Sequence, residues 1–163
     1  MTGTHSDAAA APHELTSLDT ARVEVVASAA LRLNTGGPGF TEITSDVARF
    51  VKSAGAGAGT LSLFLRHTSA SLVIQENADP DVQADLLTAL ERLVPQGQHW
   101  RHDSEGPDDM PSHVKAMLTG VSLQIPVREG ALLLGHWQGI YLVEHRAEPH
   151  RREVILQFVG SRG

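Results

Sequence analysis

Residues 60–74 read TLSLFLRHTSASLVI, two apolar runs joined by a short polar stretch. The first run, 60–66, has the composition of a β-strand, and the apolar pattern resumes at 72–74. Strands that follow one another this closely are typical of hairpin-like, antiparallel connections. The preceding tract SAGAGAG, 53–59, lacks the GK[ST] ending of a phosphate-binding loop, so we expect a flexible connector there.

Further strands and two or three helices are predicted on both sides of these runs. The expected strands lie within 20–33 and at 122–127, 131–134, 138–145 and 153–159. The expected helices run from Thr41 or Thr44 to about Ser53, over 80–94 and over 111–118. Because these elements show no regular βαβ alternation, the sequence predicts an α+β fold, a largely antiparallel β-sheet or sandwich covered by two or three helices.

Two of these segments carry apolar residues that need partners. The helix at 80–94 is the clearest one, since Asp79 is a good N-cap and Pro80 suits the first helical position. Its expected buried stripe consists of Val82, Leu86, Leu90, Leu93 and Val94. The last strand, EVILQFVG from Glu153, is apolar on both sides, which predicts burial on both faces or contact with another subunit.

The composition limits the classes of protein that the chain can represent. Its 163 residues suffice for one domain, expected over 20–163, and residues 1–19 are expected to be a disordered tail without a signal peptide. No apolar run approaches the roughly 18 residues that span a bilayer. A net charge of −6 argues against nucleic-acid or membrane partners, whereas a small phosphorylated metabolite needs only a local basic patch. The chain has no cysteine, so a metal would need His, Asp or Glu ligands, and we expect a cytoplasmic protein.

Two polar clusters lie near the central runs. His67 stands beside the hydroxyls of 68–71, a grouping that can orient a phosphate or supply a base, although the wet face of a strand has the same pattern. The second cluster, Gln75-Glu76-Asn77, precedes the helix that contains Asp85. An Asp inside a helix usually faces water, but Asp85 borders the expected buried stripe.

The segment 101–118, RHDSEGPDDMPSHVKAML, concentrates titratable groups. His102 and His113 enclose several carboxylates, among them Asp108 and Asp109, and such side chains bind divalent ions where thiolates are absent. Lys115 would balance negative charge or contact a phosphate. The spacing matches no strict metal signature such as HExxH, and a solvated loop is the alternative interpretation.

A fourth segment, GHWQGI at 135–140, places glycines around Trp137 and Gln138, which allows the backbone to approach a neighbour closely. A tryptophan in such a segment more often packs than binds a ligand. Glu144, on the strand that follows, is by the same reasoning more often exposed than catalytic.

Five motifs, in their order and spacing, resemble those of the YjbQ family, also called the secondary thiamine-phosphate synthase family. They are HTSASL (67–72), QENADPDVQADL (75–86), HDSEGPDDMPSHVKAML (102–118), SLQIPV (122–127) and GHWQGIYLVEHR (135–146). The resemblance covers about residues 20–160 and implies a YjbQ-like α+β domain that assembles as a homotrimer, with a cleft shared between subunits. It also implies a secondary activity that joins hydroxymethylpyrimidine diphosphate to a thiazole phosphate and releases pyrophosphate, beside an unsettled principal role.

The motifs and the resemblance together indicate roles for individual residues. The expected catalytic residues are Asp85, Lys115 and His67. The expected ligand-binding residues are Ser69, Ser71, Asn77, Trp137 and Gln138. The expected metal ligands are His102, His113, Asp108 and Asp109. We expect His67, His102 and His113 to converge, with one of the two aspartates nearby, on a divalent cation (zinc or magnesium) or on a phosphate.

Three positions depart from the family pattern: His136 stands where Thr is common, Gln75 where Asn is common, and His145 where an apolar or aromatic residue is expected. These departures leave the identity of the substrate undetermined, although they do not affect the expected fold. The function classes that the sequence allows are a thiamine-phosphate synthase-type transferase, a non-catalytic metal- or phosphometabolite-binding trimer, and a structural scaffold.

Overall fold

The computed structural model describes residues 18–163, so the tail expected over 1–19 lies almost wholly outside the described residues. Asp19, at the end of that expected tail, forms an ion pair with Arg128 at 3.2 Å. Within 18–163, no helix is both long and apolar enough to cross a membrane.

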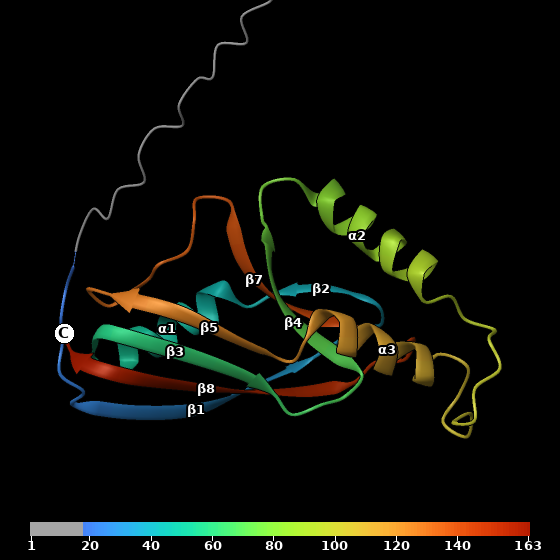
Figure 1. Ribbon diagram of the computed structural model, residues 1–163, viewed down its shortest axis with the longest axis horizontal. Coiled ribbons are helices and arrows are strands. Elements are labelled where there is room, and N and C mark those ends of the chain that lie inside the picture. Colours follow the sequence, from blue (N-terminus) through green and yellow to red (C-terminus); the bar gives the residue numbers. More distant parts are fainter. Residues whose placement is uncertain (1–17) are drawn as a thin grey trace, which may run out of the picture.

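Two antiparallel sheets form the body of the molecule (Figure 1). The strands are β1 (Val25–Asn34), β2 (Gly39–Glu42), β3 (Ala56–Leu65), β4 (Ala70–Glu76), β5 (Ser122–Arg128), β6 (Ala131–Leu132), β7 (Gln138–Glu144) and β8 (Arg151–Arg162). They form a five-stranded sheet in the order β1-β8-β3-β5-β6 and a three-stranded sheet in the order β2-β7-β4. The helices are α1 (Thr44–Ser53), α2 (Pro80–Leu93) and α3 (Asp109–Thr119). The predicted α+β class with antiparallel pairing is confirmed.

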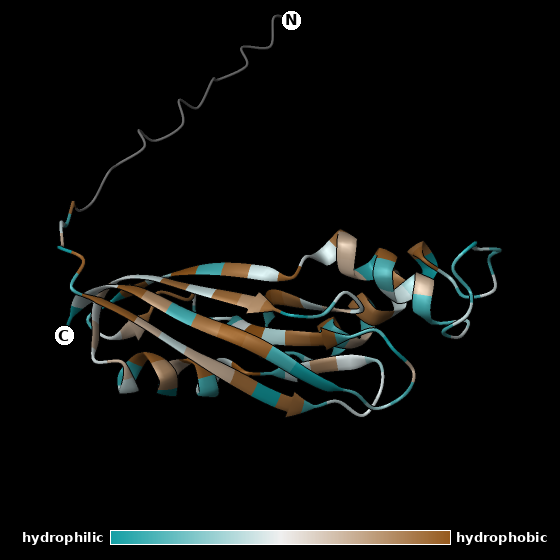
Figure 2. Ribbon diagram, turned by 90° about the horizontal axis from the view of Figure 1, so that it is seen from below, coloured by the Kyte–Doolittle hydropathy of each residue, from teal (hydrophilic) through white to brown (hydrophobic). Residues whose placement is uncertain are grey.

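The core is built on one face of the five-stranded sheet. Along β8, alternate residues Val154, Leu156 and Phe158 are buried and join a cluster that includes Val47 and Val51 of α1. The other face of β8 is half-buried or exposed. Figure 2 shows hydrophobic and hydrophilic residues alternating along the strands. The apolar residues on both sides of this strand are therefore not both covered within one chain.

The expected flexible connector at 53–59 is wrong, because β3 begins at Ala56 and includes most of the glycine tract. The glycines serve close backbone approach rather than flexibility. A Cβ at Gly57 would collide with the carbonyl oxygen of Arg162, and a Cβ at Gly59 with that of Val159. The strand is also irregular here, since its register against β8 shifts between Ala56 and Gly59.

The helix predicted from Asp79 and Pro80 is confirmed as α2, and the Asp79 side chain accepts a hydrogen bond from the Asp81 amide at 2.9 Å. The expected buried stripe is wrong, because no residue of α2 is buried and Leu93 is 71% exposed. In Figure 1, α2 lies at the periphery of the molecule, and its residues Val82, Leu86 and Leu90 are only half-buried. Of the five residues of the expected stripe, only Val94, just beyond the helix, is buried.

Two other boundaries differ from the predictions. β2 has no counterpart among the predicted strands, because its first residue, Gly39, belongs to the NTGGPG segment at 34–39, which is typical of a turn. Helix α3 begins at Asp109, two residues before the expected start, and packs against β4. This earlier start places Asp109 in the first helical turn, where it can share a face with residues one turn later.

Candidate metal centre

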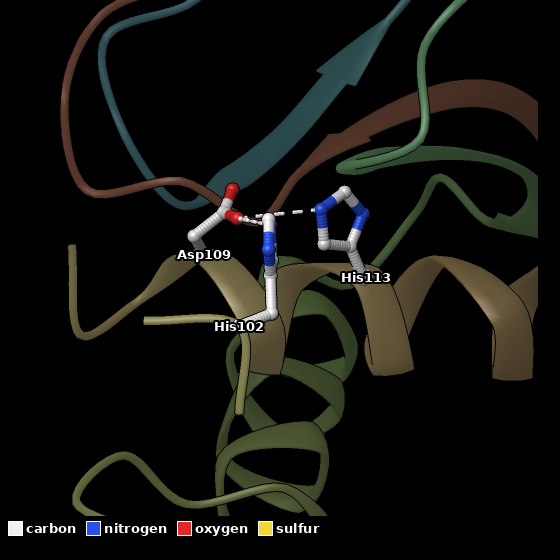
Figure 3. Close-up of side chains that lie close together, drawn as sticks. All are labelled: His102, Asp109 and His113. Atoms are coloured by element: carbon white, nitrogen blue, oxygen red, sulfur yellow. Dashed lines mark ion pairs between the residues drawn. The ribbon is translucent and has the colours of Figure 1, made fainter. Parts of the chain in front are cut away.

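Three side chains at the start of α3 form a compact group, the His–Asp group, which consists of His102, Asp109 and His113 (Figure 3). Asp109 and His113 are four residues apart and share a face of α3, and the preceding loop brings His102 to the same place. Asp109 Oδ2 lies 2.9 Å from His102 Nε2 and 3.3 Å from His113 Nε2. The structure thus brings together three of the four residues expected to be metal ligands.

The ring of His113 is held by the loop between β3 and β4. Its Nδ1 lies 2.9 Å from the carbonyl oxygen of Thr68. A carbonyl oxygen can only accept, so Nδ1 must donate, and the neutral ring then presents the lone pair of Nε2 to Asp109. A backbone carbonyl on the second nitrogen is the usual means by which proteins orient a metal-binding histidine.

Asp109 is 1% exposed, and its two oxygens have different surroundings. Oδ1 is bound by the Arg146 guanidinium. Oδ2 is a buried atom without a hydrogen-bond donor among the described residues, although two imidazole nitrogens face it. A buried carboxylate oxygen without a donor is costly, and a cation between it and the two nitrogens would remove that cost.

The dimensions and donor types of the His–Asp group fit a divalent metal. The three ligand atoms lie within 4.8 Å of one another. Tetrahedral zinc at about 2.0–2.1 Å from each ligand would require separations of roughly 3.4 Å, which small side-chain movements provide. Two imidazoles and one carboxylate suit zinc better than magnesium, which prefers oxygen ligands throughout. Three protein ligands also leave a coordination position for water or substrate.

Asp108, the fourth expected ligand, is turned away from the histidines. Its Oδ2 accepts hydrogen bonds from Arg146 Nε at 3.0 Å and from the Ala147 amide at 2.8 Å. Burial alone would raise the pKa of Asp108, but these hydrogen bonds outweigh it and leave the pKa below its ordinary value. Asp108 therefore fixes Arg146, which in turn fixes Asp109.

His67 does not join the His–Asp group within one chain. Its Nε2 accepts a hydrogen bond from the Glu153 amide at 3.0 Å, so that lone pair is in use. Burial, followed by the charge of Arg152, lowers the pKa of His67. The ring lies instead in a cavity lined by arginines at the start of β8.

Lys115 and Asp85, the other expected catalytic residues, lie in different surroundings. Lys115 is buried on α3, and its Nζ donates to Glu91 Oε2 of α2 at 2.6 Å. Its charge is thus compensated, although it borders a cavity of about 280 Å³ shared with Glu144 and His145. Asp85 is exposed on α2, as the usual behaviour of a helical Asp indicates.

The two hydroxyls expected to bind a ligand are instead engaged inside the protein. Ser69 Oγ accepts from Arg152 Nη2 at 3.2 Å. Ser71 is fully buried, and its Oγ lies 2.6 Å from His145 Nε2 and in contact with Thr119. Burial, followed by the charge of Lys115, lowers the pKa of His145 to about 4, so the ring is neutral at pH 7.

Asn77, Trp137 and Gln138 lie at the opposite end of the β4–β7 pair. Glu76 pairs with Gln138 at one end of this ladder and Ala70 with Glu144 at the other, a separation of about 20 Å at ~3.3 Å per residue. Trp137 is 59% exposed and stacks edge to face with His136. The structure does not bring this group to the His–Asp group within one chain.

Glu144, expected to be exposed, is 1% exposed, and that expectation is wrong. Its carboxylate accepts hydrogen bonds from Thr35 Oγ1 and Arg152 Nε, each at 2.7 Å, and from the amides of His145 and Arg146 at 3.0 Å. Burial would raise the pKa of Glu144, but the bonds from Arg152 and the other donors outweigh it and lower the pKa. Glu144 thus fixes the backbone that carries Arg146 to Asp109.

Arg146 and Arg152 thus orient carboxylates in and near the candidate site, and the sequence analysis assigned neither arginine a role. Both lie near the end of β7 or the start of β8, in a polar segment that is typical of an ordinary turn. In this region the sequence analysis named Glu144, the unusual histidine at position 145 and the motif at 135–146 that ends with Arg146.

Comparisons with known proteins agree with this architecture. A family model described as UPF0047 protein YjbQ-like matches residues 29–161. The UPF0047 protein sll1880 of Synechocystis is 47% identical over 132 residues, which are 80% of this chain and 90% of the relative. The UPF0047 protein YjbQ of Salmonella typhimurium is 51% identical over 103 residues, 63% of this chain and 75% of the relative.

A solved structure shows the same fold. The crystal structure of a YjbQ/UPF0047 family protein from Clostridium acetobutylicum superposes with a TM-score of 0.75 at 37% identity, covering 80% of this chain and 98% of that protein. With the family model spanning most of the chain and relatives near half identity, the chain belongs to the UPF0047 family of YjbQ-like proteins.

Proposed function

We propose that this protein binds one divalent metal ion through His102, Asp109 and His113, and that the metal centre acts on a small phosphorylated metabolite. The observation that carries the proposal is the buried Oδ2 of Asp109, which accepts no hydrogen bond from residues 18–163 and faces two imidazole nitrogens. Zinc or a similar transition ion fits these ligands better than magnesium.

The residues around the metal would hold the ligands in place. Thr68 fixes the His113 ring through its carbonyl group, and Arg146 fixes Asp109 through Oδ1. When bound, the ion would supply Lewis-acid polarisation of a phosphate oxygen or of a water molecule. A cavity of about 350 Å³ that His113 and Thr68 border would give a small ligand room on the His113 side of the group.

Among reactions of this class, the one implied by the family resemblance is the coupling of hydroxymethylpyrimidine diphosphate to a thiazole phosphate with release of pyrophosphate. A cation beside the departing pyrophosphate would stabilise its charge, as such a displacement requires. The alternative is a binding protein that retains the metal and the metabolite without turnover. Incubation of the metal-loaded protein with the two precursors separates these alternatives, since only the transferase forms thiamine phosphate.

Metal content tests the centre itself. The untagged, purified full-length protein should contain close to one transition-metal ion per chain, and His113→Ala should lose most of it while remaining folded. His99→Ala is the matched control, because His99 is an exposed histidine of the same loop outside the His–Asp group. An unchanged metal content in His113→Ala, or an equal loss in both variants, would contradict the proposal.

We also propose that the protein acts as a homotrimer in the cytoplasm. Support for self-association comes from the outer face of the five-stranded sheet, where Val26 is 64% and Phe64 52% exposed. A cytoplasmic location agrees with a chain that has no cysteine and hence no disulfide. The family resemblance implies a cleft shared between subunits, in which the Trp137 end of one subunit would reach the metal centre of another and join residues that one chain keeps apart.

A further inference from the structure

A basic pocket of about 300 Å³ lies where β8 begins. It is lined by Arg32, Arg66, His67, Arg151, Arg152 and Glu153. These residues come from the end of β1, the loop after β3 and the start of β8, so the sheet itself gathers them. A concentration of four arginines around one cavity is unexpected in a chain whose net charge is −6.

Acidic side chains only partly compensate the charge of the basic pocket. Glu153 binds Arg32 Nε at 2.6 Å and Arg66 Nη1 at 2.8 Å, one guanidinium to each oxygen. Arg152 is buried and paired with Glu144. The side chain of Arg151 forms no ion pair with residues 18–163. Three guanidinium groups thus face one carboxylate, which leaves an excess of two positive charges.

The remaining polar group of the pocket, His67, is also a donor. Its Nε2 accepts from the Glu153 amide, so the proton of the neutral ring resides on Nδ1. Burial and the nearby Arg152 lower the pKa of His67, so the ring is neutral at pH 7. Apart from Glu153, the side chains that line the pocket are all donors. A ligand that suits them presents several acceptor oxygens and negative charge.

We propose that the basic pocket binds the phosphate group of a small soluble metabolite. A guanidinium group can donate two parallel hydrogen bonds to the oxygens of one phosphate. A phosphate in this pocket would replace the Glu153 carboxylate as the partner of Arg66 and Arg32. The inference goes beyond the proposed metal centre, because none of the pocket residues belongs to the His–Asp group.

The loop that joins β3 to β4 connects the two sites. The Arg66 amide donates to the Glu153 carbonyl at 3.1 Å, and the next residue, His67, lines the pocket. The carbonyl of Thr68 then accepts from His113 of the His–Asp group. Successive residues of one short loop therefore contact the basic pocket and a metal-ligand candidate, so this loop links the two candidate sites along the chain.

Isothermal titration calorimetry with inorganic phosphate tests the pocket on the metal-free, full-length protein at constant ionic strength. The wild type should bind phosphate saturably at one site per chain, and added salt should weaken the binding. Arg151→Gln should lower the affinity at least tenfold. Glu153→Gln should raise it several-fold, because it removes the carboxylate that competes for the two arginines.

Arg162→Gln is the matched control, because Arg162 is an exposed arginine at the other end of β8, about 35 Å away at ~3.3 Å per residue. Absence of saturable binding, or equal losses in Arg151→Gln and Arg162→Gln, would overturn the proposal. If Arg151→Gln does not fold, the proposal is tested by Glu153→Gln alone: a raised phosphate affinity supports it, and an unchanged or lowered affinity contradicts it. Metal content measured on the same variants keeps this test separate from that of the metal centre.

Discussion

The guanidinium of Arg146 binds Oδ1 of Asp109 and leaves Oδ2 facing the two histidine rings. Arg146 is itself fixed, since Nε donates to Asp108 at 3.0 Å and Nη2 to the carbonyl of Glu105 at 2.8 Å. The direction of the central carboxylate of the proposed metal centre therefore depends on a residue beyond β7, remote from α3 in the sequence.

Replacing Arg146 with Gln should lower zinc affinity by about 10–100-fold, the usual effect of losing a residue that orients a metal ligand. The variant keeps all three proposed ligands, but Asp109 loses the partner of Oδ1. Competition with a chromophoric chelator measures the affinity. Arg101→Gln removes the same charge from an exposed position in the loop before α3 and should change the affinity little. Equal affinities for wild type and Arg146→Gln would exclude this positioning role.

Replacing Arg152 with Met should destabilise the fold by about 3–5 kcal/mol, because it leaves Glu144 buried without its cationic partner. Urea unfolding followed by circular dichroism measures the difference. Arg32→Met offers the comparison, since Arg32 pairs with Glu153 at 2.6 Å but is exposed, and such a pair contributes about 0–1 kcal/mol. Similar losses for the two variants would show that burial does not govern the stability of these ion pairs.

The buried His145 should make the fold sensitive to acid. Its pKa is about 4 in the folded protein and 6.5 when free, so the unfolded chain binds the proton more readily. The stability due to the neutral ring is complete above pH 6.5 and is lost as the pH falls towards 4, by about 3 kcal/mol in all.

Urea unfolding between pH 7 and 4 tests this dependence. The variant His145→Gln keeps a polar group near Ser71 but cannot titrate, so its stability should fall less steeply than that of the wild type over this range. The comparison isolates position 145, because His67 and the carboxylates titrate in both proteins. Parallel curves for the two proteins would mean that His145 does not bind a proton on unfolding.

Local sequence patterns predicted where helices and strands form better than they predicted which side chains of those elements are buried. Asp79 and Pro80 mark the start of α2 because capping is a property of adjacent residues. The exposure of Leu93 depends on whether another layer of the chain covers the helix, and no local pattern contains that information. The glycines of β3 were misleading for a similar reason, since the need for close approach arises from β8, about a hundred residues later.

In the proposed metal centre, too, local spacing was informative and the positions of residues from distant segments were not. Asp109 and His113 share a face as soon as α3 is known to begin at Asp109, so the four-residue spacing was a usable signal for choosing Asp109 over Asp108. The position of His102 is set by an irregular loop, and that of Arg146 by the end of β7. Helical or strand periodicity predicts neither position, although both residues fall within the motifs at 102–118 and 135–146, and strand register brings Arg32 of the basic pocket to Glu153.

The outer face of the five-stranded sheet should form the contact of the proposed trimer. Val26 lies opposite Val159 and Phe64 opposite Ile155 in the strand register, so these exposed or half-buried side chains form two apolar rows on one face, with the polar row Ser28, Gln157 and Ser62 between them. Light scattering should give three times the monomer mass at micromolar concentration. Phe64→Glu should shift the protein to monomer, because the contact would bury an unpaired carboxylate. Leu133→Glu, at a side chain 48% exposed outside these rows, should leave the trimer intact, whereas a monomeric wild type would refute the assembly.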